Sequence, residues 1–588
     1  MKRMGAWWQD RVAYQIYPRS FQDTNGDGFG DLPGIIARLD DLQALGVGIL
    51  WLSPVYRSPD ADNGYDISDY RDINPKFGTL EDMDRLFAEA ARRDIRVIMD
   101  LVVNHTSDEH AWFQQSRDPH SPYRDYYIWR PAKPDGSPPN NWTGFFMGSA
   151  WTLDEASGEY YLHLFDKKQP DLNYHNPKVI EEVKAIMRFW LDRGASGFRC
   201  DVINVLYKAT LDDGEKRLAV QGVEHYKSQP GTHAILRELR RDVLDHYDCF
   251  TVGETVMVNL AEAKELCDPE RRELDMVFYF DHLEVDRRVS RFVPKRFRAD
   301  RLLKVYAKWQ QGLFWNALYL ENHDQPRIVS HYGDDGVWRE RSAKLLATLL
   351  LTLRGTPFIY QGQEIGMTNF DFQGMDELRD VESFNIDRLL QSKRVPRRLR
   401  WRWIRKSSRD NARTPMQWSD APGAGFTTGK PWIGINGNYH RLNYETQRGD
   451  ETSVLHFYRR MIALRAGSET LKYGAFAPLF ANRRVMAYTR TLNDERLTVL
   501  LNFSGTPARA PAEGEVVVSN AGTATYAGRL APWEAVVLRR PVRHTEPGEP
   551  QDQAHGPALP VNAAPEGDGR QAAAPAQPSA KATGEGKP

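Results

Sequence analysis

Residues 95–103 have the sequence Ile-Arg-Val-Ile-Met-Asp-Leu-Val-Val. A short run of mainly β-branched and other apolar residues is typical of a buried strand in a parallel sheet. Residues 80–92, which precede it, carry apolar side chains at helical spacing. Together the two segments predict a helix that leads into a buried strand, which is the repeating unit of an α/β fold.

Further runs of this kind extend along the first three quarters of the chain. They lie at 12–17, 48–52, 197–201, 250–254, 276–280, 316–320 and 357–360. Amphipathic stretches such as 179–192 and 339–353 lie between them. About eight strand-and-helix units predict a (β/α)8 TIM barrel.

Three changes of pattern divide the chain. Residues 105–174 are rich in Trp, Tyr, Pro, Asn and Gly and lack periodicity, so we expect a long loop-rich subdomain inserted after the third strand. The barrel then comprises 1–104 and 175–474. Alternating segments within 475–542 predict a C-terminal antiparallel β-sandwich domain, and 543–588, without aromatic residues, is predicted to be a disordered tail.

Composition excludes several classes of protein. The 588 residues contain 78 Lys and Arg against 79 Asp and Glu, so the chain offers no net charge to nucleic acid or an anionic membrane. Mean hydropathy is −0.60, and no apolar run approaches the roughly 20 residues of a membrane span. Three cysteines and an N-terminus without an apolar signal core favour a cytoplasmic protein.

Four of the predicted strands end in acidic residues, namely Asp100, Asp201, Glu254 and Asp324. The carboxyl ends of barrel strands meet on one face, so these side chains are expected to converge. Carboxylates in one cleft repel each other, so some hold a proton while others stay ionised. A general acid needs the protonated form, and a base or nucleophile needs the ionised form. Paired carboxylates in a chain with 11% aromatic residues favour glycosidic-bond chemistry.

The strand-end motifs resemble those of the α-amylase superfamily, glycoside hydrolase family 13. The four motifs are Asp-Leu-Val-Val-Asn-His at 100–105, Gly-Phe-Arg-Cys-Asp-Val-Ile-Asn at 197–204, Val-Gly-Glu at 252–254 and Glu-Asn-His-Asp-Gln at 321–325. A fifth, Gln-Pro-Asp-Leu-Asn at 169–173, resembles the oligo-1,6-glucosidase and α-glucosidase branch. The similarity extends over roughly 7–540.

This resemblance implies a retaining exo-α-glucosidase that acts by double displacement and needs no catalytic cofactor. Asp201 would be the nucleophile, kept ionised by Arg199 on the same face of its strand. Glu254 would be the general acid and then the base, with a raised pKa. Asp324 would bind the 2-OH and 3-OH of the reacting sugar.

The family pattern also implies the residues that hold a small oligosaccharide. They are His105 and His323 at the hydroxyls of the reacting glucose, Tyr65 and Asp66 as stacking platform and 4-OH ligand, Arg413 at the same closed end, and Phe146 and Phe165 on the leaving-group side. A closed end would restrict the enzyme to terminal glucosyl residues.

Val202 follows the nucleophile and matches branch members that prefer α-1,6 linkages. The implied substrates are isomaltose, isomalto-oligosaccharides and panose. Alternatives are an α-1,4-preferring glucosidase and a sucrose isomerase or trehalose synthase. A non-catalytic transporter subunit with this fold is disfavoured because all three catalytic acids are present. The sequence leaves the oligomeric state open.

Residues 23–31 contain oxygen-bearing side chains at alternate positions, with glycines between them. An EF-hand is excluded because its twelfth position is Gly34. The resemblance implies a structural Ca2+ or Mg2+ held by Asp23, Asn25, Asp27 and Asp31 and the carbonyl of Phe29. A separate basic block at 393–406, which contains no acidic residue, is interpreted as a solvated helix or loop beside the barrel mouth, the alternative being a polyanion site.

Overall fold

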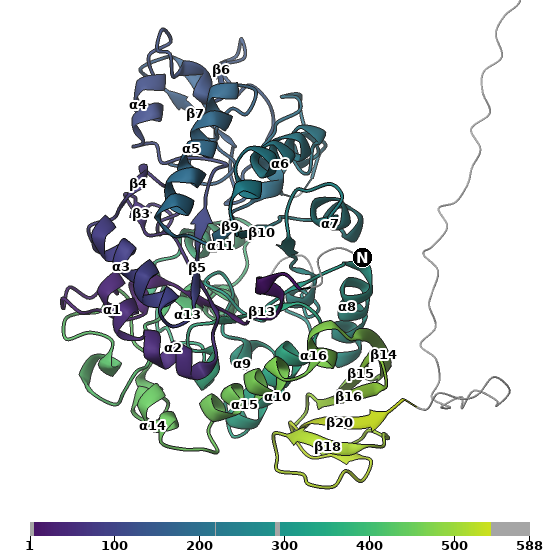
Figure 1. Cartoon of the computed structure of the whole chain (residues 1–588). Coiled ribbons are helices and arrows are strands. Elements are labelled where there is room, and N and C mark those ends of the chain that lie inside the picture. Colours follow the sequence, from purple (N-terminus) through teal and green to yellow (C-terminus); the bar gives the residue numbers. More distant parts are fainter. Residues whose placement is uncertain (1–4, 218, 288–293, 543–588) are drawn as a thin grey trace, which may run out of the picture. The chain divides into compact units, whose positions relative to one another are not determined.

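The computed structural model describes residues 5–217, 219–287 and 294–542 (Figure 1). The prediction of a disordered tail at 543–588 lies outside these residues. None of the helices in the described ranges is long and apolar enough to span a bilayer.

A sheet of eight parallel strands forms the centre of the chain, and all eight predicted strands contribute to it. The hydrogen-bonded order is β11-β10-β9-β5-β2-β1-β13-β12. The two end strands, β11 and β12, lie against each other, so the sheet curves into a barrel. The strands are β1 (Ala13–Ile16), β2 (Ile49–Leu52), β5 (Arg96–Leu101), β9 (Gly197–Cys200), β10 (Phe250–Glu254), β11 (Met276–Phe278), β12 (Ala317–Leu318) and β13 (Thr356–Tyr360). The predicted (β/α)8 fold is confirmed.

Alternation along the strands separates two apolar cores. Ile49 and Trp51 of β2 pack inside the barrel with Phe250 of β10. Leu50 and Leu52, which point the other way, pack against the surrounding helices. Both faces of the sheet are therefore covered, as a parallel sheet requires.

The helices that follow the strands begin and end where the sequence provides caps. In α3 (Leu80–Ala91) the Thr79 side chain accepts from the Asp82 amide, and Asp82 accepts from Thr79 in return. In α5 (Pro177–Arg193) Asn176 caps the start. The other helices are α1 (Leu32–Ala37), α2 (Leu39–Leu45), α6 (Pro230–Asp242), α7 (Leu260–Cys267), α8 (Ala299–Gly312), α9 (Ile328–His331), α10 (Arg339–Thr352), α13 (Asp410–Arg413), α14 (Tyr444–Arg448), α15 (Val454–Ala466) and α16 (Glu469–Tyr473).

Between β5 and α5 the chain forms a subdomain, seen at the top of Figure 1. It contains α4 (Ala111–Ser116) and a small antiparallel sheet in the order β6-β8-β7. These strands are β6 (Trp129–Pro131), β7 (Trp151–Asp154) and β8 (Glu159–Leu162). The sequence predicted loops here, and this short sheet was missed because its strands are only three or four residues long.

A buried ammonium ties this subdomain to the barrel. Lys208 Nζ lies 2.7 Å from Asp171 Oδ2 and 2.9 Å from Asn104 Oδ1. It also donates to the carbonyls of Val205 and Leu206. A cation surrounded by four oxygens holds a subdomain residue beside the end of β5.

The C-terminal part forms the antiparallel domain that the sequence predicts, at the bottom of Figure 1. Its five-stranded sheet has the order β14-β15-β16-β20-β18, and β17 pairs with β19. α8 packs against β14 and β15, and α10 against β16 and β20. The strands are β14 (Ala475–Ala481), β15 (Val485–Leu492), β16 (Glu495–Asn502), β17 (Ala508–Arg509), β18 (Glu515–Ser519), β19 (Arg529–Leu530) and β20 (Ala535–Pro541).

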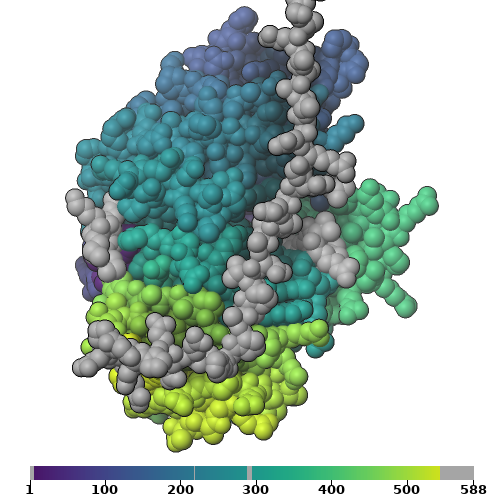
Figure 2. Space-filling model, turned by 90° about the vertical axis from the view of Figure 1, so that its right-hand side faces the viewer, coloured from purple at the N-terminus to yellow at the C-terminus, as the bar shows by residue number. Residues whose placement is uncertain are grey.

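Two further elements border the mouth of the barrel. The hairpin β3 (Tyr56–Arg57) and β4 (Asp69–Ile73) follows β2, and α11 (Val381–Ser392) and α12 (Arg397–Ser407) follow β13. The basic block is thus largely helical, and Ile404 is the buried residue of α12. Figure 2 shows this part of the chain, in green, at the surface of the molecule.

Candidate active site

A cavity of about 360 Å³ opens at the carboxyl ends of the barrel strands. Three of the four strand-end acids, Asp201, Glu254 and Asp324, line it. The fourth, Asp100, lies beneath it and is 1% exposed. The convergence expected from the sequence therefore occurs, with one acid in a supporting position.

Arg199 links three of these carboxylates. Its guanidinium lies 2.7 Å from Asp100 Oδ1, 2.6 Å from Asp201 Oδ1 and 2.6 Å from Glu254 Oε2. The register explains this, because Asp100 of β5 pairs with Arg199 of β9, and Asp201 is two residues further along the chain, directly after β9. Asp100 also accepts from Tyr65 and so orients both the arginine and the aromatic ring.

Burial and the guanidinium act in opposite directions on Asp201 and Glu254. Burial raises the pKa of Asp201 to about 6 against the opposing effect of Arg199. Burial raises the pKa of Glu254 to about 7, again partly offset by Arg199. Glu254 therefore holds a proton more readily than Asp201, which is the division that an acid and a nucleophile need.

Asp324 is kept ionised. Burial alone would raise its pKa, but His323, Arg409 and Arg413 together hold it well below the usual range. Arg409 Nη1 and Arg413 Nη2 lie 3.1 Å and 2.9 Å from Asp324 Oδ1. An anion fixed by two arginines is suited to accept hydrogen bonds from sugar hydroxyls.

Asp62 and Arg409 form an ion pair in the cavity wall, with carboxylate and guanidinium 3.6 Å apart. Both residues line the cavity, and burial raises the pKa of Asp62 to about 7 despite Arg409. Asp66 lies behind this wall, fully buried, and accepts the backbone N–H groups of Ala61 and Asp62. Arg413 likewise does not line the cavity and contacts Asp324 from below.

The rings around the reacting position are held by hydrogen bonds and stacking. Tyr65 stacks on His323 with ring centroids 5.2 Å apart. His105 lines the cavity and its Nε2 lies 3.1 Å from Gln169 Nε2. Burial lowers the pKa of His105 to about 4 and also lowers that of His323, so both imidazoles are neutral at pH 7. Of these residues, His323 lies just below the lining.

With this geometry in place, comparisons with known proteins identify the chain's relatives. Residues 15–474 match the family described as Alpha amylase, catalytic domain. The oligo-1,6-glucosidase of Parageobacillus thermoglucosidasius is 49% identical over 91% of this chain and 99% of its own. The chain belongs to the α-amylase family, in its oligo-1,6-glucosidase branch.

Two other relatives show how wide this branch is. The glucan 1,6-alpha-glucosidase of Streptococcus pneumoniae is 44% identical over 90% of this chain and 98% of its own. The crystal structure of isomaltulose synthase from Klebsiella sp. LX3 has a TM-score of 0.89 at 45% identity, covering 91% of this chain and all of that one. Hydrolases and a synthase thus share one architecture, as the sequence alternatives anticipate. The glycoside hydrolase assignment is confirmed by the family.

Part of the cavity wall of this family member is apolar, and the Arg409 guanidinium lies 5.4 Å from the ring centroid of Phe146 in this part. Phe146, Phe165 and Val202 line it, and the first two rings are 5.8 Å apart in an edge-on arrangement. Asn385 of α11 donates to the carbonyl of Phe146 at 2.9 Å, which joins the subdomain to the α11 segment across the mouth. Val202 has φ of 36°, a left-handed conformation that a β-branched residue rarely adopts.

The structure brings together residues that sequence reasoning did not select. They are Asp62, Gln169, Glu382 and Arg409, all of which line the cavity. Asp62 and Asp66 occur in one turn that contains Asn63 and Gly64, both with positive φ. Such a turn has no periodicity, so the sequence does not say which acid faces inward. Gln169 was visible as part of the fifth motif.

The loop predicted to bind a metal is a compact turn held by its own side chains. Asp23 Oδ1 accepts from the backbone amides of Asn25 and Gly26, and Asp27 Oδ1 accepts from that of Phe29. Asp31 Oδ2 accepts from the amide of Thr24. The five predicted ligand residues therefore belong to one loop. Within the described ranges, no cluster of three or more His, Cys, Asp or Glu side chains is arranged to hold a metal.

Proposed function

We propose that the chain is a retaining exo-α-glucosidase that removes terminal nonreducing glucosyl residues from short α-1,6-linked oligosaccharides. The observation that carries this proposal is the contact of Arg199 with both Asp201 and Glu254 at 2.6 Å, in a cavity whose wall contains the Asp62–Arg409 ion pair. This contact holds a nucleophile and a protonated acid beside the same glycosidic bond of the substrate.

The reaction gives the two acids the roles that the family pattern implies. Asp201, the more acidic group, attacks the anomeric carbon while Glu254 gives its proton to the departing glycosidic oxygen. The glucosyl ester is then cleaved by water, whose proton Glu254 accepts. Asp201 is released as a carboxylate, and Glu254 regains its proton, so the site returns to its starting state.

The Asp62–Arg409 pair is proposed to close one end of the cavity, which limits action to terminal residues. Asp62 and Arg409 are placed to bind the 4-OH side of the nonreducing glucose and to leave no room for a further sugar. Tyr65, beside Arg199 and Asp100, provides a flat surface for the sugar ring. A polymer would have to thread past the Asp62–Arg409 pair.

The linkage preference rests on Val202 and on the relatives. Its side chain narrows the leaving-group side of the cavity next to Glu254, whose carboxylate lies 3.4 Å from the Val202 amide. Relatives of this chain are named oligo-1,6-glucosidase and glucan 1,6-alpha-glucosidase. Isomaltose, isomalto-oligosaccharides and panose are the substrates proposed.

The experiment is time-resolved proton NMR of the purified protein with isomaltose, maltose and sucrose in parallel. Early release of α-glucose chiefly from isomaltose is expected. Faster cleavage of maltose would make the enzyme an α-1,4-glucosidase. Conversion of sucrose to an isomer with little free glucose would make it a synthase, the activity in the name of the Klebsiella relative.

We also propose that the loop at 23–31 holds a structural Ca2+ or Mg2+. Its donors are all oxygens, which these cations prefer, and Asp23, Asp27 and Asp31 have no ion-pair partner among the described residues. Asn25 and the Phe29 carbonyl complete the set. Metal analysis before and after chelation, with the melting temperature, tests this; unchanged metal content and melting temperature would refute it.

A further inference from the structure

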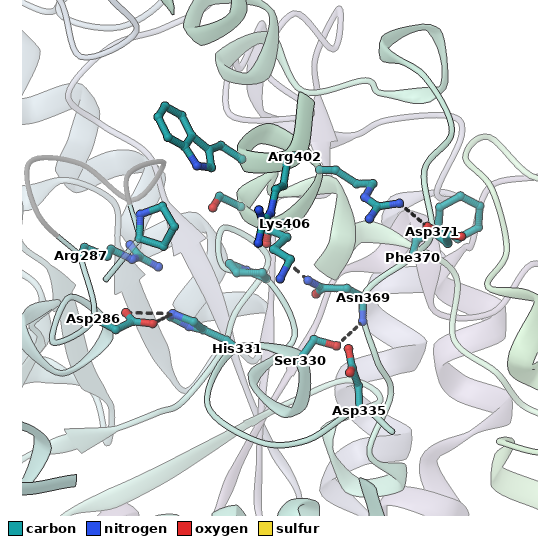
Figure 3. A pocket seen from close by; sticks show the side chains of 15 residues that line it. Asp286, Arg287, Ser330, His331, Asp335, Asn369, Phe370, Asp371, Arg402 and Lys406 are labelled. Atoms are coloured by element: carbon teal, nitrogen blue, oxygen red, sulfur yellow. Dashed lines mark hydrogen bonds and ion pairs between the residues drawn. The ribbon is translucent and has the colours of Figure 1, made fainter. Parts of the chain in front are cut away.

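A second cavity has a volume of about 570 Å³ (Figure 3). Arg287 lines both cavities and is 9% exposed. Its Nη2 donates to Gln325 Oε1 at 3.2 Å, so this pair stands at the boundary, one residue beyond Asp324. The second cavity therefore adjoins the catalytic one at Arg287.

The far wall of this cavity is the basic face of α12. Arg402, Arg405 and Lys406 line it, and Figure 3 shows Arg402 and Lys406 on the helix above His331 and Asn369. The α11–α12 segment, 381–407, has nine Lys and Arg residues but two acids. Like charges one turn apart on a helix repel each other, so this face favours a counter-charge.

The ion pairs of the segment leave two of these cations without a carboxylate. Arg400 pairs with Asp387 and Arg405 with Asp371. Among the described residues no ion pair includes Arg402 or Lys406. These two side chains are one helical turn apart and face the same cavity.

Two of the three acids that line the cavity, Asp286 and Asp371, are already paired. Asp286 faces His331, with both carboxylate oxygens within 3.1 Å of His331 Nε2. Asp371 pairs with Arg405, and Figure 3 shows Asp335 below Ser330, away from Arg402 and Lys406. The centre, between Arg287 and α12, is thus the basic part.

The floor is fixed before any ligand arrives. The Asn369 amide N–H donates to Ser330 Oγ at 2.9 Å, and its side-chain oxygen accepts from the Arg327 backbone. Asn369 Nδ2 donates to the carbonyl of Lys406 at 3.4 Å, which joins the floor to α12. A preorganised floor lowers the entropy cost of binding.

We propose that this cavity binds the phosphate of a phosphorylated hexose on the leaving-group side of the catalytic site. A phosphate monoester has three acceptor oxygens and nearly two negative charges, which suits the cations Arg287, Arg402 and Lys406. The volume is within the range of small-molecule sites. The proposal rests on the glucosidase function proposed above, and extends its substrates to glucosides with a phosphorylated leaving sugar.

The test compares glucose 6-phosphate, glucose and inorganic phosphate as inhibitors of p-nitrophenyl α-glucoside hydrolysis. Glucose 6-phosphate is expected to inhibit roughly tenfold more strongly than glucose, since charge-assisted hydrogen bonds are added. In the double variant Arg402→Ala/Lys406→Ala this advantage should disappear, with turnover of the uncharged substrate unchanged. The matched control is Arg397→Ala/Arg398→Ala, which removes the same charge from exposed positions of α12 outside the cavity.

Each outcome decides the matter. The site is supported if glucose 6-phosphate loses its stronger inhibition, relative to glucose, in Arg402→Ala/Lys406→Ala alone. An equal loss in Arg397→Ala/Arg398→Ala would show long-range electrostatic attraction only and would overturn the proposed site. Inhibition by inorganic phosphate as strong as that by glucose 6-phosphate would show a site for free phosphate instead. If the wild-type enzyme does not hydrolyse the glucoside, the proposed function fails, and calorimetric titration of glucose 6-phosphate still tests the cavity.

Discussion

The guanidinium of Arg199 lies 2.6 Å from the carboxylate of Glu254, the group that must carry a proton. A cation at this distance favours the charged carboxylate, yet the pKa of Glu254 is raised to about 7, because its burial outweighs the ion pair. Arg199 also contacts Asp100 and Asp201, so its charge is divided among three acids. This sharing lets one arginine stabilise a nucleophile without stripping the acid of its proton.

We therefore expect a bell-shaped dependence of kcat/KM on pH for isomaltose. Activity should fall below about pH 6, where Asp201 gains a proton, and above about pH 7, where Glu254 loses one. Since Asp201 and Glu254 interact, the two apparent pKa values of the pH profile belong to the pair and not to either residue alone. Glu254→Gln should lower kcat by roughly 10²–10⁴ and abolish the alkaline limb, leaving the acid limb in place. An alkaline limb that persists in this variant would assign it to another group.

The proposed closed end of the cavity provides a matched pair of variants. Asp62→Asn should lower kcat/KM for isomaltose roughly 10–100-fold, because a charge-assisted hydrogen bond to substrate is worth about 1.5–3 kcal/mol. Asp66→Asn should leave kcat/KM within about threefold and lower the melting temperature, because Asp66 bonds two backbone amides. Steady-state kinetics and thermal unfolding of both variants check this. The reverse pattern would restore Asp66 as the substrate ligand.

The fold could be predicted from the sequence because its signals are local. Each barrel strand is a short apolar run, and each motif acid follows from its place at a strand end. The convergence of Asp201, Glu254 and Asp324 then follows from the topology alone. The roles proposed for them agree with the family pattern and with the order of their pKa values.

The residues of the proposed closed end could not be chosen in this way. Asp62 and Asp66 differ in direction because the chain between them turns through left-handed conformations at Asn63 and Gly64. Arg409 and Arg413 are one helical turn apart and both reach Asp324, from different depths. Only the folded structure distinguishes a residue that lines the cavity from one that packs behind the lining.

Lys208 should be required for the attachment of the subdomain. Lys208→Met leaves Asp171 buried without its cation, which costs about 3–5 kcal/mol of unfolding free energy. A lower melting temperature and a loss of activity are expected, because the backbone of Asp171 forms a β-bridge with that of His105, which lines the cavity. The double variant Lys208→Met/Asp171→Leu should recover part of the stability, since no charge remains unpaired. A melting temperature equal to that of the single variant would mean that the ion pair is not the cause.

Val202 is the most specific test of linkage preference. Its side chain reaches the leaving-group side of the cavity near Phe146 and Phe165, so Val202→Ala should widen that side for an α-1,4-linked sugar. Differences in apolar bulk are worth about 1–3 kcal/mol, so the ratio of maltose to isomaltose kcat/KM should rise roughly tenfold. Val205→Ala is the control, because Val205 is buried three residues away and does not line the cavity. It should lower stability and leave the ratio unchanged. A constant ratio in Val202→Ala would move the origin of the preference to the α11 side of the mouth, where Glu382 and Ile386 face the same space.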